Sequence, residues 1–343
     1  MTNSLRKKRR AAFKQNKKAL ISLYLFIFIF VISLFAPFIA NDKPIMLWDK
    51  QKIYFPQIEF VPDLMLGGEL ETVADFSDPF TKEFLAANSF FVLDTPIKYS
   101  YNTVDYLSLE PFPSKPSLKH LLGTDDQGRD VLARLLYALR ISILFGLSLT
   151  FLSAVLGVFV GAVQGYFGGK VDLFIGRFLE IWSSLPQLFI LIIVSSIIAP
   201  SFLSLLLILL LFSWTQLTGV VRAEFLKTRG LDYVKAAKTL GVSDFKIMWR
   251  HILPNALVAT ITYIPFMLSA AIVSLSALDF LGFGLPVGTP GLGELIRQGK
   301  ENLSAPWLGL TAFFVMTILL ALLVFIGEGV RDAFDPHQEN KNV

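Results

Sequence analysis

The chain has 343 residues, of which 54% are hydrophobic and 17% charged, and its mean hydropathy is +0.59. Soluble domains have about 45–50% apolar and about 25% charged residues, so the composition excludes an ordinary soluble enzyme and a disordered chain. The sequence has no cysteine, which excludes a disulfide framework, a thiolate metal site and a cysteine nucleophile. The formal net charge is only +4, so its distribution along the chain is more informative than its sum.

The N-terminus combines a basic segment with an apolar one. Residues 1–18 contain eight basic residues and no acidic residue, and residues 19–41 carry no charge. Because Lys and Arg are enriched at the cytoplasmic ends of membrane spans, we expect residues 1–18 to be a basic cytoplasmic N-terminus and residues 19–40 to be transmembrane helix 1. Phe38 occupies a position at which a cleavage site needs a small residue, so we interpret this helix as an uncleaved anchor and not as a signal peptide.

A long polar insertion follows the first helix. Residues 41–140 contain 10 basic and 15 acidic residues, which favours a location outside the cytoplasm. Residues 53–60 have the composition of a strand, with Pro56 as the mark of an edge strand. We expect residues 41–120 to form a small domain of mixed secondary structure. It is either a docking surface for another protein or a lobe that only shields the membrane helices.

The segment before the next apolar run carries a polar signature, formed by Gly123, Thr124, Asp125, Gly128, Arg129 and Asp130. The Gly-Thr-Asp sequence predicts a turn and a candidate helix N-cap. From Asp130 onwards the pattern is amphipathic, with Leu132 and Leu135 on one face and Arg134 on the other. This pattern predicts an interfacial helix on the outer membrane face, and a solvated helix with a polar cap is the alternative.

The rest of the chain contains four more charge-free runs, residues 141–169, 181–221, 252–278 and 302–327. A helix needs about 20 residues to span a membrane, so the second run is long enough for two helices joined at Pro200-Ser201. The chain is therefore expected to have six transmembrane helices. Five of them form a core over residues 121–330, with spans at about 141–165, 178–199, 201–221, 255–278 and 306–327. This topology places the loop 222–254 and the tail 331–343 in the cytoplasm, and the loop has seven basic and three acidic residues.

Few residues within the spans are candidates for chemistry. Gly157 and Gly161 form a small-xxx-small pair that favours close helix packing. Arg177 and Glu180 are one turn apart and are expected to form a local ion pair. No Asp, Glu, Lys or His lies at the middle of a span, which argues against a proton-coupled carrier. Polar residues that could line a transport pathway, although packing explains each of them as well, are Gln187, Ser195, Ser196, Trp214 and Gln216.

The loop between spans four and five has the most specific pattern. Residues 232–255 predict a helix, a turn at Gly241 and a second helix, with Asp232 and Ser243 as candidate caps. Ala236 and Ala237 form a small patch flanked by basic residues, which suits insertion into a groove of a partner. The alternative is a surface hairpin whose basic side chains reach lipid headgroups.

This loop resembles the EAA motif of ABC-importer permeases, EAA-x3-G-x9-I-x-L-P. The residues that match the motif are Ala236, Ala237, Gly241, Leu253 and Pro254, whereas Lys235 replaces the Glu and His251 replaces the Ile. Both replacements resemble the dipeptide/oligopeptide branch of the family, as do the polar signature and residues 278–285. Residues 39–44 with the insertion, and residues 327–336, look like the permeases of Yej-type importers of microcin C and peptides.

The resemblance implies an all-α polytopic membrane protein with the type I ABC importer permease fold and a periplasmic insertion between helices 1 and 2. It would be a multi-pass protein of the bacterial inner membrane with both termini in the cytoplasm. Its implied function is that of a permease subunit for oligopeptides or microcin C-like conjugates, which couples through the Ala236–Gly241 helix to ATPase domains. Alternatives are a permease for another solute such as nickel, or a membrane-embedded enzyme.

The resemblance also implies the partners. They are a second permease that completes a heterodimeric pathway, two ATPase domains in separate or fused chains, a periplasmic substrate-binding protein and membrane lipid, with no nucleic acid. The chain itself would be non-catalytic and would hold no cofactor, because the partner subunits use the ATP.

Overall fold

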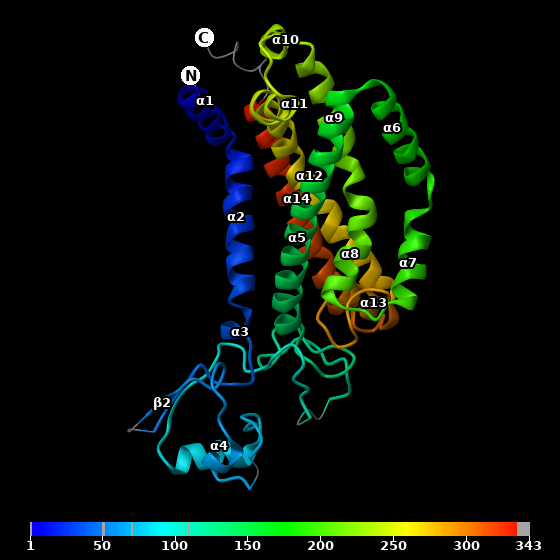
Figure 1. The fold of residues 1–343 in the computed structure, drawn as a ribbon. Helices are drawn as coiled ribbons and strands as arrows, with labels where there is room; N and C mark the ends of the chain where they lie inside the picture. The colour runs from blue at the N-terminus through cyan, green and yellow to red at the C-terminus, as the bar shows by residue number, and fades with distance from the viewer. Residues whose placement is uncertain (1, 50–51, 70, 107, 109, 335–343) are drawn as a thin grey trace. The chain divides into compact units, whose positions relative to one another are not determined.

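The chain is mostly helical (Figure 1). The structure is a computed structural model that describes residues 2–49, 52–69, 71–106, 108 and 110–334. Four helices of the described part are long and apolar enough to cross a membrane, and two bent helix pairs bring the number of candidate spans to as many as six. Of the expected tail 331–343, residues 335–343 lie outside the described residues.

The helices are α1 (Thr2–Gln15), α2 (Lys17–Leu34), α3 (Ala36–Ile39), α4 (Pro79–Ala87), α5 (Val131–Phe167), α6 (Gly169–Ser184), α7 (Gln187–Ile197), α8 (Phe202–Ser213), α9 (Thr215–Arg229), α10 (Asp232–Thr239), α11 (Asp244–Ile247), α12 (Leu253–Leu281), α13 (Leu292–Glu301) and α14 (Pro306–Phe334). The strands are β1 (Met46–Trp48), β2 (Ile53–Tyr54) and β3 (Phe91–Leu93). A short 3₁₀ helix, η1 (Asp63–Leu66), and a π-helical turn, η2 (Met248–Ile252), complete the elements. The chain divides into two compact units, unit 1 with residues 1–28, 142–286 and 315–343, and unit 2 with residues 29–141 and 287–314.

Close packing of α5 against α9 organises unit 1. A methyl group on Gly161 would lie 2.6 Å from the carbonyl oxygen of Thr218, and one on Gly165 would lie 2.6 Å from that of Arg222. Gly157 approaches α9 in the same way one turn earlier. Residues with side chains would therefore force the two helices apart, so these glycines serve helix packing.

Two of the apolar segments in unit 1 are bent. The axes of α6 and α7 differ by 75° across Leu185-Pro186, and those of α8 and α9 differ by 41° across Trp214. Pro186 removes a backbone donor and disfavours a helical conformation at Leu185, which ends α6. Between the two bent pairs, the Ser201 hydroxyl accepts a hydrogen bond from the Ser204 amide at 3.0 Å and caps α8.

The two ends of the described chain and the hairpin helix α10 lie at the same end of unit 1 (Figure 1). The Asn16 amide, at the junction of α1 and α2, donates to Asp332 at 3.5 Å. The Arg9 guanidinium lies 4.6 Å above the ring of Phe334. The start of α2 and the end of α14 are therefore neighbours in this unit.

Unit 2 contains a small sheet with its own core. The three antiparallel strands follow the order β2-β1-β3, with Leu47 opposite both Tyr54 and Val92. Leu47 packs with Leu66 and Leu85 from the adjoining helices. The strand expected over residues 53–60 is only two residues long, because Pro56 lacks an amide donor and a turn begins at Phe55.

The expected interfacial helix does not exist as a separate element. α5 begins at Val131 and runs without a break to Phe167. Asp130 is its N-cap, since the carboxylate accepts a hydrogen bond from the Ala133 amide at 2.7 Å, so the Gly-Thr-Asp turn does not cap the helix. Arg134 is fully buried. The prediction was wrong because Arg134 contacts the carboxylates of Asp125 and Glu294 and not solvent or lipid headgroups.

Candidate functional sites

The hairpin (residues 232–252, in unit 1) turns at Gly241, which has the expected left-handed conformation with φ +79°. The Gly241 amide donates to the Lys238 carbonyl at 3.0 Å and the Val242 amide donates to the Ala237 carbonyl at 3.1 Å. This pair of bonds is a Schellman motif, in which glycine avoids the strain of a positive φ. The expected caps are absent, because neither Asp232, the first residue of α10, nor Ser243 caps a helix with its side chain.

The two alanines of the hairpin have different surroundings. Ala237 is buried, with 8% of its surface exposed, and it packs in a cluster with Val234 and Ile247. Ala236 is exposed on α10. Only Ala236 is therefore available to a partner, whereas Ala237 holds α10 against α11.

Large apolar side chains are exposed on the same hairpin. Leu240, Phe245 and Trp249 have 83%, 75% and 66% of their surface exposed. The rings of Phe245 and Trp249 are stacked, with centroids 6.3 Å apart and planes 12° apart. We call these three residues the apolar surface of the hairpin. A soluble loop that has no partner seldom exposes a group of this kind, so it indicates an interaction surface.

A polar clamp attaches the hairpin to the membrane helices. The hydroxyl of Tyr166, near the end of α5, donates to Asp244 at 2.5 Å, and Arg229 of α9 donates to the Tyr166 carbonyl at 2.8 Å. At the other end of the hairpin, Leu253 and Pro254 are the first residues of α12, which continues directly from the π-helical turn η2. The alanine pair of the motif therefore lies on α10, and its Leu-Pro end lies at the start of α12.

Two ion pairs of unit 1 involve residues of α6. Arg222 of α9 makes two bonds to the carboxylate of Asp172 of α6, at 2.5 and 2.6 Å. Arg177 and Glu180 form the expected local pair at 2.6 Å, and both side chains are mostly exposed. An exposed pair of this kind contributes little to stability and has the geometry of a surface contact, not of a catalytic site.

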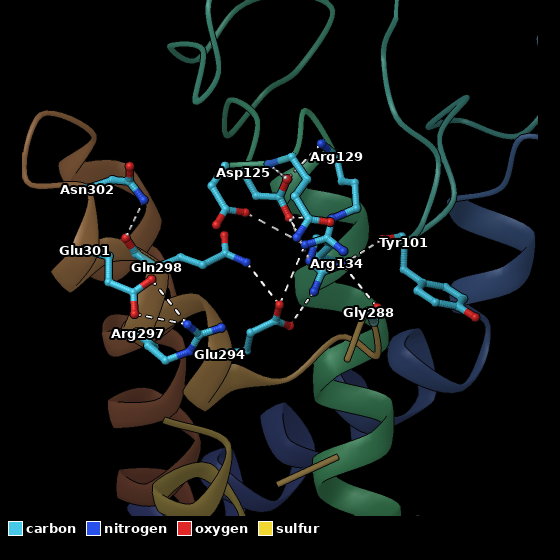
Figure 2. A network of polar contacts seen from close by, with 12 residues as sticks. Tyr101, Asp125, Arg129, Arg134, Gly288, Glu294, Arg297, Gln298, Glu301 and Asn302 are labelled. Carbon is cyan, nitrogen blue, oxygen red and sulfur yellow. Dashed lines mark hydrogen bonds and ion pairs between the residues drawn. The ribbon is translucent and has the colours of Figure 1, made fainter. Parts of the chain in front are cut away.

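The polar signature forms a buried ionic network in unit 2 (Figure 2). The Asp125 carboxylate accepts bonds from the backbone and the side chain of Arg129, at 2.9 and 2.7 Å. Arg134 lies between Asp125, at 3.3 Å, and Glu294 of α13, and it also donates to the Tyr101 carbonyl at 3.0 Å. Two buried cations therefore face two carboxylates, the arrangement in which buried charge is tolerated.

Asp130, another residue of the signature, belongs to a second set of polar contacts around the buried side chain of His120. His120 has its Nδ1 2.8 Å from Asp130 and its Nε2 3.2 Å from Asp105, and Lys119 donates to Asp105 at 2.5 Å. Only an imidazolium can donate to two carboxylates at once. Burial lowers the pKa of His120, whereas its bonds to Asp130 and Asp105 raise it, and the net direction is upward.

The six signature residues are all buried. Gly123 and Gly128 have positive φ angles of +75° and +80°, and the Thr124 hydroxyl accepts a bond from the Ser114 amide at 2.8 Å. Within residues 123–130, only Asp126 and Gln127 are exposed. The signature therefore shapes unit 2 from inside, and direct contact of its buried members with another protein is not possible in this conformation.

Reasoning from the sequence missed the partners of this network. Glu294 and Gln298 lie on α13, a short amphipathic helix between two apolar runs that hydropathy does not detect as a membrane span. A signal was nevertheless present. Arg134 is an arginine within an apolar segment, and such a residue needs an acidic partner elsewhere in the chain.

The five candidate pathway residues fall into three groups. The Trp214 indole donates to the Leu211 carbonyl at 3.0 Å and the Ser196 hydroxyl donates to Ile193 at 2.7 Å, so local bonds satisfy both. The Ser195 hydroxyl is buried with no partner among the described residues. Gln187 and Gln216 are brought together at one small cavity of unit 1.

Two family models match the chain. Residues 137–340 match the model of the binding-protein-dependent transport system inner membrane component. Residues 4–56 match the N-terminal TM domain of oligopeptide transport permease C.

Several curated proteins are similar over most of the chain. It is 52% identical over 330 residues to the inner membrane ABC transporter permease protein YejE of Escherichia coli (strain K12), and this match covers 96% of each of the two chains. It is 49% identical over 356 residues to the peptidoglycan transport system permease protein YejE of Agrobacterium fabrum, with 97% of this chain and 93% of the relative covered. It is 35% identical over 245 residues to the oligopeptide transport system permease protein OppC of Lactococcus lactis subsp. cremoris, with 70% and 83% covered.

A solved structure has the same fold. The inward-facing MetNI methionine ABC transporter matches with a TM-score of 0.50 and 17% identity, and the match covers 58% of this chain and 96% of that chain. At this identity the likeness concerns the fold alone.

Proposed function

The chain belongs to the family of binding-protein-dependent transport system inner membrane components, and on this premise we propose that it is a permease subunit of an ATP-driven importer of peptides. The oligopeptide and peptidoglycan transport permeases among its relatives support a substrate that contains peptide bonds. Oligopeptides and microcin C-like conjugates both satisfy this description. The chain makes and breaks no bond, and ATP is hydrolysed by partner subunits.

The proposed topology has six spans, with each bent helix pair counted as one. Both termini and the hairpin then lie in the cytoplasm, and residues 41–120 lie in the periplasm. Two observations support this assignment. The start of α2, the end of α14 and the hairpin lie at the same end of unit 1, and the N-terminus and the loop carry an excess of Lys and Arg.

We propose that the hairpin enters a groove of a cytoplasmic ATPase domain. The observation that carries this proposal is the apolar surface of Leu240, Phe245 and Trp249, which is exposed on the same hairpin as Ala236. Apolar and aromatic side chains in this setting are typical of the centre of a protein interface. A second permease would complete the transport pathway, and a substrate-binding protein would deliver the peptide on the side of residues 41–120.

The clamp offers a route from the ATPase to the membrane helices. A displacement of the hairpin moves Asp244, and the hydroxyl of Tyr166 carries that movement to α5. The glycine contacts between α5 and α9 leave no space for one helix to shift alone, so the two helices move together as a rigid body. The ATPase and the pathway would thus be coupled through contacts that differ between two states.

The substitution Ala236→Arg tests this function. Ala237→Arg is a poorer test because Ala237 is buried, and a charge there would unfold the hairpin. Ala236→Arg should leave the amount of membrane-inserted protein unchanged while ATPase subunits no longer co-purify and peptide uptake falls to background. Lys238→Arg, which keeps the charge on the same helix, should behave as the wild type. Normal ATPase co-purification and uptake by the Ala236→Arg protein would contradict the coupling role.

A further inference from the structure

The helix α6 is attached to the rest of unit 1 through one face only. None of its residues is buried. The half-buried positions recur every three or four residues, so they share one face of the helix, and all other residues of α6 are exposed. The helix therefore depends on a small number of specific contacts. The half-buried residues are Asp172, Ile175, Gly176, Leu179 and Trp182.

The first end of this face is bonded to α9. The Asp172 carboxylate accepts two bonds from the Arg222 guanidinium, at 2.5 and 2.6 Å. The side-chain amide of Gln164, on α5, also donates to the Asp172 carbonyl at 3.3 Å. A pair of parallel bonds between a guanidinium and a carboxylate is strong and fixes the orientation of both groups. Asp172 is thus a firm point of attachment.

The other end of the face is bonded to α8 through a tryptophan. The Trp182 indole donates to the Leu211 carbonyl at 3.0 Å. Its ring also stacks on those of Phe178 and Phe212, with centroids 5.6 and 5.4 Å apart. Leu211 lies one turn before Trp214, where α8 and α9 are bent by 41°. A bend in a membrane helix frees backbone carbonyls, which groups of neighbouring helices must then satisfy.

The two attachments lie on opposite sides of the α8–α9 bend. Leu211 precedes the bend at Trp214, and Arg222 follows it. The helix α6 is unbroken from Asp172 to Trp182 and runs antiparallel to α8 and α9, because its first end contacts the later residue. At a rise of about 1.5 Å per residue, the two contacts are about 15 Å apart on α6 and about 16 Å apart on the bent pair. A straight helix of matching length therefore bridges the bend.

We propose that α6, between Asp172 and Trp182, is a brace that fixes the angle between α8 and α9. A rigid helix bonded on both sides of a bend holds its two contact points at a constant distance. The bend can then open or close only after one contact is released. The Leu185-Pro186 break directly follows α6, so the brace can follow α8 and α9 without moving α7 as a rigid continuation. This role does not depend on which solute is transported.

The angle can be measured with two spin labels, one on each side of the bend. The chain has no native cysteine, so Leu207→Cys on α8 and Lys227→Cys on α9 provide the only two labelling sites. Both side chains are mostly exposed. Double electron–electron resonance of the full-length chain in lipid nanodiscs gives the distribution of distances between the labels. We expect one narrow distribution while the brace is intact.

Two conservative substitutions release the brace at one end each. Trp182→Phe keeps an aromatic ring for the stack but removes the N–H donor, and Asp172→Asn keeps the size of the side chain but removes its charge. Each should broaden or shift the distance distribution. The double variant should give the same distribution as the single variants, because the loss of one contact already frees the brace. Two independent sites this far apart would instead have additive effects.

Two matched controls keep the brace intact. Trp214→Phe removes a second indole that donates to the same Leu211 carbonyl at 3.0 Å, but does so from within the bend. Arg177→Ala removes an exposed charge from the opposite, unattached part of the α6 surface. Both variants should retain the narrow distribution.

Three results would overturn the proposal. They are an unchanged narrow distribution in either single variant, a double variant that is broader than both single variants, and a Trp214→Phe variant as broad as Trp182→Phe. In the last case, loss of any bond to the Leu211 carbonyl would explain the effect without a brace. None of these measurements involves uptake, so the proposed function would still stand. It would fail separately if the wild-type importer takes up no peptide.

Discussion

Replacing Arg134 by Met should strongly destabilise unit 2. The Arg134 side chain is fully buried, forms an ion pair with Glu294, lies 3.3 Å from Asp125 and donates to the Tyr101 carbonyl. The substitution leaves the buried carboxylate of Asp125 and the half-buried carboxylate of Glu294 with Arg129 as the only arginine of the network near them among the described residues. Breaking a buried ion pair costs about 3–5 kcal/mol. For chains of roughly 150–250 residues, each kcal/mol of destabilisation lowers the Tm by about 2–4 °C. The Tm of Arg134→Met should therefore fall by about 6–20 °C, and the fall should be towards the lower end of this range because the chain is longer.

The assay is thermal unfolding of the purified protein in detergent, followed by tryptophan fluorescence. The double variant Arg134→Met with Glu294→Gln removes the uncompensated carboxylate as well, so it should recover a substantial part of the lost Tm. Arg177→Ala breaks an exposed ion pair and should change the Tm little. A Tm for Arg134→Met close to that of Arg177→Ala, or no recovery in the double variant, would refute the electrostatic explanation.

Two further predictions concern packing and pH. Gly161→Leu should separate α5 from α9, because even a methyl group would lie 2.6 Å from the Thr218 carbonyl oxygen, and the yield of monodisperse protein in size-exclusion chromatography should fall several-fold. For His120, burial lowers the pKa but the bonds to carboxylates raise it to a net higher value. Its stabilising effect is therefore complete below the unfolded pKa of about 6.5 and is lost as the pH rises through the folded value. The Tm difference between the wild type and His120→Gln should shrink over that range.

Each of these predictions has its own control. Gly219→Leu is the control for packing, since nothing lies within 4 Å of a methyl group built there, and its yield should equal that of the wild type. Equal yields of Gly161→Leu and Gly219→Leu would show that the α5–α9 contact is not close. For the histidine, a Tm difference that stays constant from about pH 6 to 9 would exclude the imidazolium as its source.

Sequence patterns predict correctly those structural features that depend only on residues close together in the chain. Residues 253–278 of the charge-free run 252–278 lie within α12, since apolar side chains along a helix need no distant partner to favour a membrane. Gly241 ends α10 in the left-handed conformation because the turn is encoded by the glycine itself. The pair Arg177–Glu180 formed as expected because one helical turn brings the two side chains together.

Features that depend on distant residues were missed. The charge-free run 181–221 continues through Pro186, so a search for charge-free runs does not register the 75° bend. The network of Arg134 joins residues far apart in the chain, and the amphipathic pattern around it has the same appearance as a solvated helix. The different burial of Ala236 and Ala237 depends on how α10 packs against α11, and a short helix contains too few turns to predict that packing.

The bond between Arg134 and Glu294 also sets an order for biogenesis. The two residues are 160 positions apart in the chain. At about 5–20 residues per second, the ribosome needs roughly 8–32 s to reach Glu294 after it has made Arg134. Until then Arg134 has no carboxylate from α13, and burying it would leave a cation poorly compensated. Residues 121–134 should therefore remain hydrated during the early steps of synthesis, and unit 2 should close only after α12 has been inserted and α13 has been made.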